Sequence, residues 1–171
     1  MGEPLARLGP VAFLLERLAA AEPAGFLLSL DSEDGPSIQK LCDERPANRF
    51  LRQKVYAHLV ARGRIAVLEE VAQAFALRPD ATVEDLRAWL AAWNARVVDA
   101  GEAEPLAEAA LAAVVAHPAD AELCYLLALV YEKAQPADAG YALACYQRVL
   151  AIQTWGPVAD AARDAIERLN R

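Results

Sequence analysis

The side chains that most often carry out enzymatic chemistry are scarce in this sequence. It contains two histidines, His58 and His117, and three cysteines, Cys42, Cys124 and Cys145. His117 precedes a proline at the expected end of a helix, where an imidazole interacts favourably with the terminal carbonyl groups. Cys124 and Cys145 fall on helix faces that we expect to be buried, and buried cysteine usually packs as a small apolar residue. We therefore expect structural roles for His117, Cys124 and Cys145.

Sequence motifs that would assemble a catalytic or cofactor site are also missing. The chain has no glycine-rich phosphate loop, no HExxH helix, no Cys-x-x-Cys pair and no GxSxG elbow. The adjacent acids Glu69 and Glu70 point in different directions on a helix, so they do not form an acid–base pair. We therefore expect a protein that is not an enzyme and that holds no metal and no cofactor.

Positive charge is concentrated in one stretch of the chain, which we call the basic run. Between Arg45 and Leu68 there is no acidic residue, and the basic residues are Arg45, Arg49, Arg52, Lys54, Arg62 and Arg64. Arg45, Arg49 and Arg52 recur at helical spacing with Tyr56 adjoining. A guanidinium group binds a carboxylate through two parallel hydrogen bonds. One interpretation is a surface that binds a carboxylate or an acidic peptide. The other is an ordinary solvated surface that helps to balance the acidic C-terminal half of the chain.

Net charge and cysteine usage narrow the class of protein. The 24 acidic and 17 basic residues give a net charge of −7. This charge repels a phosphate backbone, so we expect no nucleic-acid partner. The cysteines lack metal or redox spacing, which favours a reducing, cytoplasmic location. The apolar stretch 11–21 is interrupted by Glu16 and Arg17 and is too short to cross a bilayer, so we expect no membrane association.

The elements expected to position these residues are all helices. Apolar residues make up 56% of the chain, with much alanine and leucine, whereas β-branched and aromatic residues are comparatively few. This composition favours helix over strand. Prolines mark helix beginnings, because proline is tolerated in the first helical turn and disruptive further in. We predict an all-α protein with helices at 10–21, 36–43, 46–61, 65–77, 82–98, 105–116, 120–134, 138–153 and 157–169.

The helix expected at 82–98 carries clear local signals. The Thr82 hydroxyl is placed to accept a hydrogen bond from an amide of the first turn, and Asp85 follows at the position of a capping-box acid. Trp89 and Trp93 fall on the same side of this helix. We expect both indoles to pack in the core, and a ligand cage is the alternative.

Residues 121–152 follow a pattern of paired helices. Small and apolar residues occupy the positions at which two antiparallel helices would meet: Ala121, Leu127, Ala128, Tyr131, Ala142, Tyr146, Val149 and Ile152. Three prolines, Pro79, Pro118 and Pro157, recur at equal spacing. The stretch resembles a tetratricopeptide repeat, although Cys124 stands where that family usually carries tryptophan. The resemblance extends over residues 47–155.

This resemblance implies a right-handed superhelix of antiparallel helical hairpins, a TPR-like α-solenoid. Residues 46–155 would form about three hairpins, followed by a capping helix within 156–171. Residues 1–45 would form an N-terminal helical segment with an acidic loop, and the whole chain, 1–171, would be one domain. Solenoids of this kind present an extended concave surface to partners.

The function implied by the resemblance is that of a non-enzymatic scaffold or adaptor that binds a peptide or protein segment in its groove. The first helix of each hairpin would line the groove, with Glu84, Arg87, Ala91 and Asn94 in the middle unit and Glu122, Tyr125, Leu129 and Glu132 in the last. The predicted partner-binding residues are Arg49, Arg52, Tyr56, Arg87, Asn94, Tyr125 and Leu129. Two alternatives are a small client-specific chaperone and an accessory domain of an enzyme complex. The protein would be a monomer or a homodimer.

Overall fold

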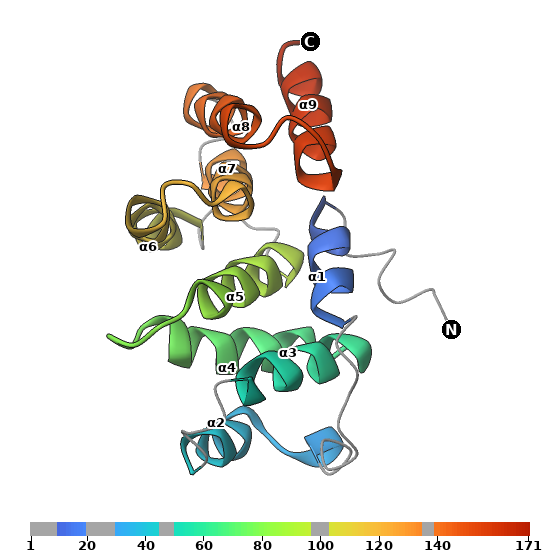
Figure 1. Ribbon diagram of the computed structural model, residues 1–171, viewed down its shortest axis with the longest axis vertical. Coiled ribbons are helices and arrows are strands. Elements are labelled where there is room, and N and C mark those ends of the chain that lie inside the picture. The colour runs from blue at the N-terminus through green and yellow to red at the C-terminus, as the bar shows by residue number, and fades with distance from the viewer. Residues whose placement is uncertain (1–9, 20–29, 45–49, 97–102, 135–138) are drawn as a thin grey trace. The chain divides into compact units, whose positions relative to one another are not determined.

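A computed structural model describes residues 10–19, 30–44, 50–96, 103–134 and 139–171 of the chain (Figure 1). Within these ranges the secondary structure is helical and no strand occurs. The prediction of an all-α protein is therefore confirmed. Each helix expected from the sequence is present. The parts of the expected helices at 20–21, 46–49, 97–98 and 138 lie outside the described residues.

The chain divides into two compact units, the first ending at Arg96 and the second beginning at Val97. This division falls inside the stretch 82–118, which the sequence pattern assigned to one hairpin. The superhelix and the single domain stay predictions.

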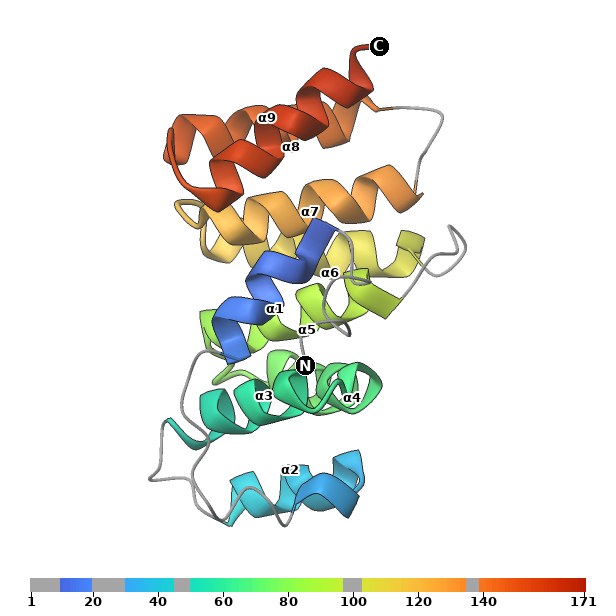
Figure 2. The same ribbon diagram turned by 90° about the vertical axis from the view of Figure 1, so that its right-hand side faces the viewer.

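The first unit consists of helices α1 to α5. Their bounds are α1 Ala12–Ala19, α2 Gly35–Asp43, α3 Leu51–Ala61, α4 Ile65–Ala76 and α5 Val83–Arg96. Helix α4 packs against α5 and also contacts α2 and α3, while α1 contacts α3 and α5 (Figure 2). Trp89 and Trp93 are buried in this unit, as expected for core residues. Other buried side chains are Leu15, Ile38, Val55, Leu59, Leu68, Val71, Phe75 and Leu90.

A glycine turn connects α3 to α4. Gly63 has φ of 68°, a left-handed conformation that glycine adopts without steric cost. Its amide donates to the carbonyl of Val60, and the next amide, of Arg64, donates to the carbonyl of Leu59. This pair of hydrogen bonds satisfies carbonyl groups at the end of α3. The turn therefore ends α3 where the sequence predicted a break.

The second unit consists of helices α6 to α9. Their bounds are α6 Ala103–Ala116, α7 Ala121–Ala134, α8 Gly140–Ile152 and α9 Pro157–Leu169. Helix α7 packs against α6 and α8, and α9 packs against α8 and α7. Tyr131 and Ile152 are half-buried, and the other residues of the repeat pattern are buried: Ala121, Leu127, Ala128, Ala142, Tyr146 and Val149. Adjacent helices thus pack in pairs, an arrangement compatible with a helical repeat.

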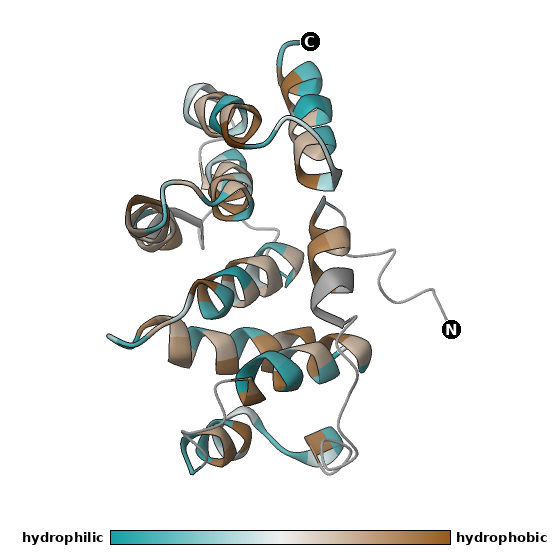
Figure 3. Ribbon diagram, viewed as in Figure 1, coloured by the Kyte–Doolittle hydropathy of each residue, from teal (hydrophilic) through white to brown (hydrophobic). Residues whose placement is uncertain are grey.

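Helix α9 is amphipathic and covers α8. It begins at Pro157, in the first helical turn. Val158, Ala162 and Ala165 are buried, whereas polar residues such as Asp164 are exposed. Figure 3 shows both kinds of residue around this helix. The predicted capping helix therefore has the expected pattern of one packed side and one solvated side.

A shared carboxylate ties three helices of the second unit together. Glu132 of α7 lies 2.8 Å from Nη1 and 2.9 Å from Nη2 of Arg168 in α9. The hydroxyl of Tyr146 in α8 donates to the same carboxylate. Burial, and then this hydrogen bond, raises the pKa of Tyr146 above its usual range. The phenol therefore remains a hydrogen-bond donor.

Candidate functional site

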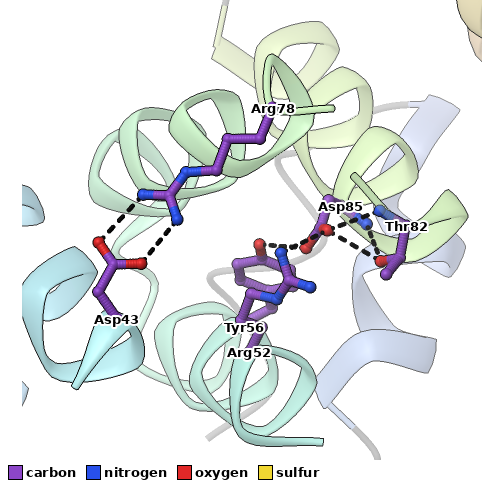
Figure 4. Close-up of polar contacts among 6 residues, drawn as sticks. All are labelled: Asp43, Arg52, Tyr56, Arg78, Thr82 and Asp85. Carbon is purple, nitrogen blue, oxygen red and sulfur yellow. Dashed lines mark hydrogen bonds and ion pairs between the residues drawn. The ribbon is translucent and has the colours of Figure 1, made fainter. Parts of the chain in front are cut away.

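A buried carboxylate, Asp85, organises polar side chains from two helices of the first unit (Figure 4). Asp85 lies in the first turn of α5 and is 1% exposed. Its Oδ1 accepts a hydrogen bond from the Tyr56 hydroxyl at 2.7 Å, and its Oδ2 lies 2.9 Å from Nη1 of Arg52. The amide and the hydroxyl of Thr82 both donate to Oδ2, each at 2.9 Å. We call Arg52, Tyr56, Thr82 and Asp85 the Asp85 cluster.

Local sequence fixes the position of Asp85. The Thr82 amide donates to the Asp85 carboxylate, and the Asp85 amide donates in return to the Thr82 hydroxyl at 3.3 Å. This is the reciprocal arrangement of a capping box, as the sequence predicted. On α3, Arg52 and Tyr56 are one helical turn apart and therefore share a face. That face meets the beginning of α5 at Asp85.

The hydrogen bonds of the Asp85 cluster satisfy its buried members. Tyr56 is fully buried, and burial followed by the negative charge of Asp85 raises the pKa of its phenol above the usual range. The phenol therefore stays protonated and donates to Asp85. The carboxylate accepts from four donor groups, which is close to its full capacity. The cluster is thus suited to holding Arg52 in place rather than to reacting.

Arg52 and Arg78 both contact the Phe75 ring, and Arg78 forms a second ion pair. The guanidinium carbons of Arg52 and Arg78 lie 4.8 Å and 4.3 Å from the centre of the Phe75 ring. Arg78 also forms two hydrogen bonds with Asp43, at the end of α2, of 2.6 Å and 3.1 Å. These hydrogen bonds hold the pKa of Asp43 below its usual value. Side chains from α2, α3, α4 and α5 are therefore connected around Phe75.

A pocket of about 300 Å³ opens beside the Asp85 cluster, between the beginnings of α3 and α5. Its wall is formed by Phe50, Arg52, Gln53, Thr82, Glu84 and Asp85. Phe50 is 61% exposed, and Gln53 and Glu84 are half-buried. Within the described residues, the side chains of Gln53 and Glu84 make no hydrogen bond or ion pair. The pocket thus offers an aromatic ring and two unused polar side chains.

The predicted partner-binding residues of the first unit have different environments. Arg52 lines the pocket, and Tyr56 is buried and donates a hydrogen bond to Asp85. Arg87 is half-buried on α5. Asn94 is 7% exposed, and its Nδ2 donates to the carbonyl of Leu90 at 2.9 Å. Arg49 lies outside the residues that the structure describes.

The two predicted partner-binding residues of the second unit are buried. Tyr125 is 2% exposed and Leu129 is 5% exposed. The Tyr125 ring packs against that of Tyr146, with the ring centres 5.6 Å apart. Helical periodicity identifies a common face but does not distinguish an open groove from a contact between helices. Partner contact at these two residues stays a prediction.

Much of the basic run is compensated by contacts within the first unit. Arg52 pairs with Asp85, and Nη2 of Arg62 lies 3.0 Å from a carboxylate oxygen of Asp31. The other oxygen of Asp31 lies 2.7 Å from Nε2 of the buried His58. Arg64 donates to two backbone carbonyls of the segment before α2. These partners all lie in the first unit, whereas the second interpretation placed the balancing acids in the C-terminal half.

The pocket is not apparent from the sequence. Glu84 was predicted as a groove residue, whereas no sequence pattern indicated Phe50 or Gln53. The available signal was the capping box at Thr82, which marks the beginning of α5. A capping box is a local signal. It does not indicate that the beginning of α3, a distant part of the sequence, lies opposite the beginning of α5.

Burial lowers the acidity of cysteine thiols in both units. Burial raises the pKa of the Cys42 and Cys145 thiols to about 11 in each case, so both stay protonated near neutral pH. Among the residues whose placement is described, no three His, Cys, Asp or Glu side chains are arranged to hold a metal ion. No described helix combines the length and apolar character needed to cross a membrane.

Comparison with known proteins gives no family. The chain matches no protein-family model, no curated protein and no solved structure. The resemblance to tetratricopeptide repeats therefore rests on the sequence pattern and on the packing of adjacent helices, and membership of that family stays a prediction.

Proposed function

We propose that this protein is a non-enzymatic protein–protein interaction adaptor whose pocket between α3 and α5 holds part of a partner segment. The observation that carries the proposal is the pocket itself, with its exposed aromatic ring, its unused polar groups and a wall fixed by the Asp85 cluster. A preorganised wall lowers the entropic cost of binding. A volume of about 300 Å³ lies at the lower end of the range for ligand sites, which suits a side chain of a larger partner.

The chemistry of the surrounding groups supports binding over catalysis. The carboxylate of Asp85 is occupied by donors from its own unit, and Tyr56 donates to it. Neither group is therefore available to transfer a proton to a substrate in the pocket. The three cysteines are free, which is in keeping with the cytoplasmic location expected from the sequence.

The adaptor proposal is tested by affinity capture with matched variants. The full-length protein, the double variant Phe50→Ala/Glu84→Arg and the control variant Glu108→Arg would each be used to capture proteins from native lysate. Glu108 is exposed on α6, so the control makes the same charge change away from the pocket. We expect a partner that the wild type and the control retain and the pocket variant loses. A partner captured equally by all three would show that the pocket is not the binding site.

Exposed apolar side chains support a second candidate function, that of a client-specific chaperone. On α6, Leu111 and Val115 are 43% and 70% exposed, and Figure 3 shows this helix in hydrophobic colours. Trp155 is 78% exposed. Exposed apolar surface is a feature of proteins that hold unfolded or partly folded clients. Co-expression with a captured client tests this candidate, since a client that is equally soluble with and without the protein would exclude it.

A further inference from the structure

We infer that the pocket between α3 and α5 receives a basic side chain, lysine or arginine, of the partner segment. The inference rests on the proposed function and specifies the chemistry of the same pocket. The basic run suggested an acidic partner, whereas this inference calls for a basic one. The difference arises because Arg52, the basic residue of the pocket, is paired with Asp85.

The charged side chains that line the pocket favour a basic ligand. Arg52 and Asp85 carry opposite charges, and their charged atoms lie 2.9 Å apart. They form a neutral pair within the wall. Glu84 adds a carboxylate that has no ion pair among the described residues. Counted over the six described lining residues, the wall carries a net charge of −1, which attracts a cation.

The uncharged lining residues also suit a basic side chain. Phe50 presents an exposed ring at the pocket, and an aromatic face attracts the cationic head of lysine or arginine. The apolar stem of either side chain packs on such a ring while its head reaches a carboxylate. Gln53 supplies a carbonyl oxygen that accepts hydrogen bonds from an ammonium or a guanidinium group. Phe50, Gln53 and Glu84 together match all parts of a basic side chain.

An acidic side chain fits the same pocket poorly. Nη1 of Arg52 is already engaged by Asp85, and the guanidinium group lies over the Phe75 ring. A carboxylate entering beside Arg52 would approach both Asp85 and Glu84. Like charges brought together at short range oppose binding and thereby exclude the wrong partner. The pocket thus selects against acidic groups as well as for basic ones.

Peptide pools test the sign of the selected charge. Short peptides with acetylated and amidated ends would carry a central lysine, arginine, glutamate or norleucine, flanked by mixed Ala, Gly, Ser and Leu. Each pool would be titrated into the ¹⁵N-labelled full chain, and the amide signals of Gln53 and Glu84 would be followed by NMR. We expect the lysine and arginine pools to shift these signals progressively, with no comparable shift from the glutamate or norleucine pools.

Matched variants locate the interaction. Glu84→Gln should weaken binding of the better basic pool by about threefold to fivefold, the effect of losing a partly exposed ion pair. Phe50→Leu should weaken it by about twofold to fivefold through loss of the cation–π contact. Glu108→Gln removes a carboxylate from α6 and should leave binding unchanged. Added salt should weaken binding more in the wild type than in Glu84→Gln.

The outcomes separate this inference from the proposed function. If the glutamate or norleucine pool shifts the pocket signals more than the basic pools do, the charge assignment is overturned and the pocket remains a peptide site. The same holds if Glu84→Gln leaves binding of the basic pool unchanged. If no pool shifts the pocket signals, both the inference and the placement of the partner site are overturned.

Discussion

Replacing Asp85 by asparagine is the most direct test of how the first unit is held together. The substitution keeps the shape of the side chain but removes the charge that faces Arg52. The Tyr56 hydroxyl can rotate from donating to accepting, so this hydrogen bond survives an amide in either orientation. The principal loss is the ion pair with Arg52, together with weaker hydrogen bonds from Thr82.

The expected cost of Asp85→Asn follows from burial. Breaking a buried ion pair costs about 3–5 kcal/mol, because the remaining charge lacks a partner. The Asp85 side chain is 1% exposed, but that of Arg52 is 19% exposed and still reaches water. This partial exposure places the cost at the lower end, about 3 kcal/mol. A loss of that size is a large part of the stability of a small domain.

Urea unfolding followed by tryptophan fluorescence measures this cost. Trp89 and Trp93 lie buried on α5, the helix that Asp85 begins, so their emission reports on the first unit. Trp155, in the second unit, is 78% exposed and should change less on unfolding. A destabilisation of about 3 kcal/mol corresponds to a midpoint lowered by roughly 2 M urea for a unit of this size.

The neighbouring carboxylate provides the matched control. Glu84→Gln removes the same charge one residue earlier, from a half-buried side chain without an ion pair among the described residues. It should change stability by no more than about 0.5 kcal/mol. Equal midpoints for Asp85→Asn and Glu84→Gln would refute the argument that the ion pair between Asp85 and Arg52 stabilises the beginning of α5. The two substitutions should nevertheless both weaken the binding of basic peptides, because each removes one negative charge from the pocket wall.

Three other perturbations probe separate contacts. Arg168→Met removes the double contact with Glu132 and should destabilise α9 by about 1 kcal/mol. The value is modest because the arginine side chain is 57% exposed. Amide hydrogen exchange should accelerate in α9, and unchanged exchange would contradict a stabilising role for this ion pair. The Cys42 thiol should react with a disulfide reagent at mildly alkaline pH at least about tenfold more slowly in the folded protein than in urea. The reason is that burial raises the pKa of this thiol to about 11. Equal rates would show that the thiol is accessible. Hydrogen bonding to Arg78 lowers the pKa of Asp43, so the stability contributed by this pair should be complete above the unfolded carboxyl pKa of about 3.9 and be lost as pH falls through the lower folded value. The urea midpoints of wild type and Asp43→Asn should therefore converge in acid, and a constant difference would be inconsistent with the ion pair.

Near the Asp85 cluster, the residues that hold the pocket wall in place differ from those proposed to contact the partner. Asp85 and Tyr56 are buried and hydrogen-bonded to each other, whereas Phe50 is exposed in the same wall region. Groups held by buried partners retain their position without a ligand, which favours binding by a preformed surface. The residues proposed to contact the partner are therefore distinct from those that maintain the wall.

Sequence alone determined the helical architecture of each unit. The capping box of Thr82 and Asp85, the left-handed turn at Gly63 and the proline that begins α9 appear where the sequence placed helix ends. These features depend on residues within about one helical turn of each other, so short stretches of sequence specify them. The burial of Ala128 and Tyr146 likewise followed from helical periodicity.

Only the tertiary structure decided what these elements bring together. Asp85 meets Tyr56 across 29 positions of sequence, and the pocket joins residues of α3 to residues of α5. Packing within the first unit pairs Arg52 with an acid, which changes the charge available to a partner. Packing within the second unit buries Tyr125, a predicted groove residue. Periodicity specifies which residues share a face of one helix, but which face of another helix lies opposite depends on how distant segments pack. The helices could therefore be predicted from local sequence, whereas the pocket and its net charge depend on the tertiary structure.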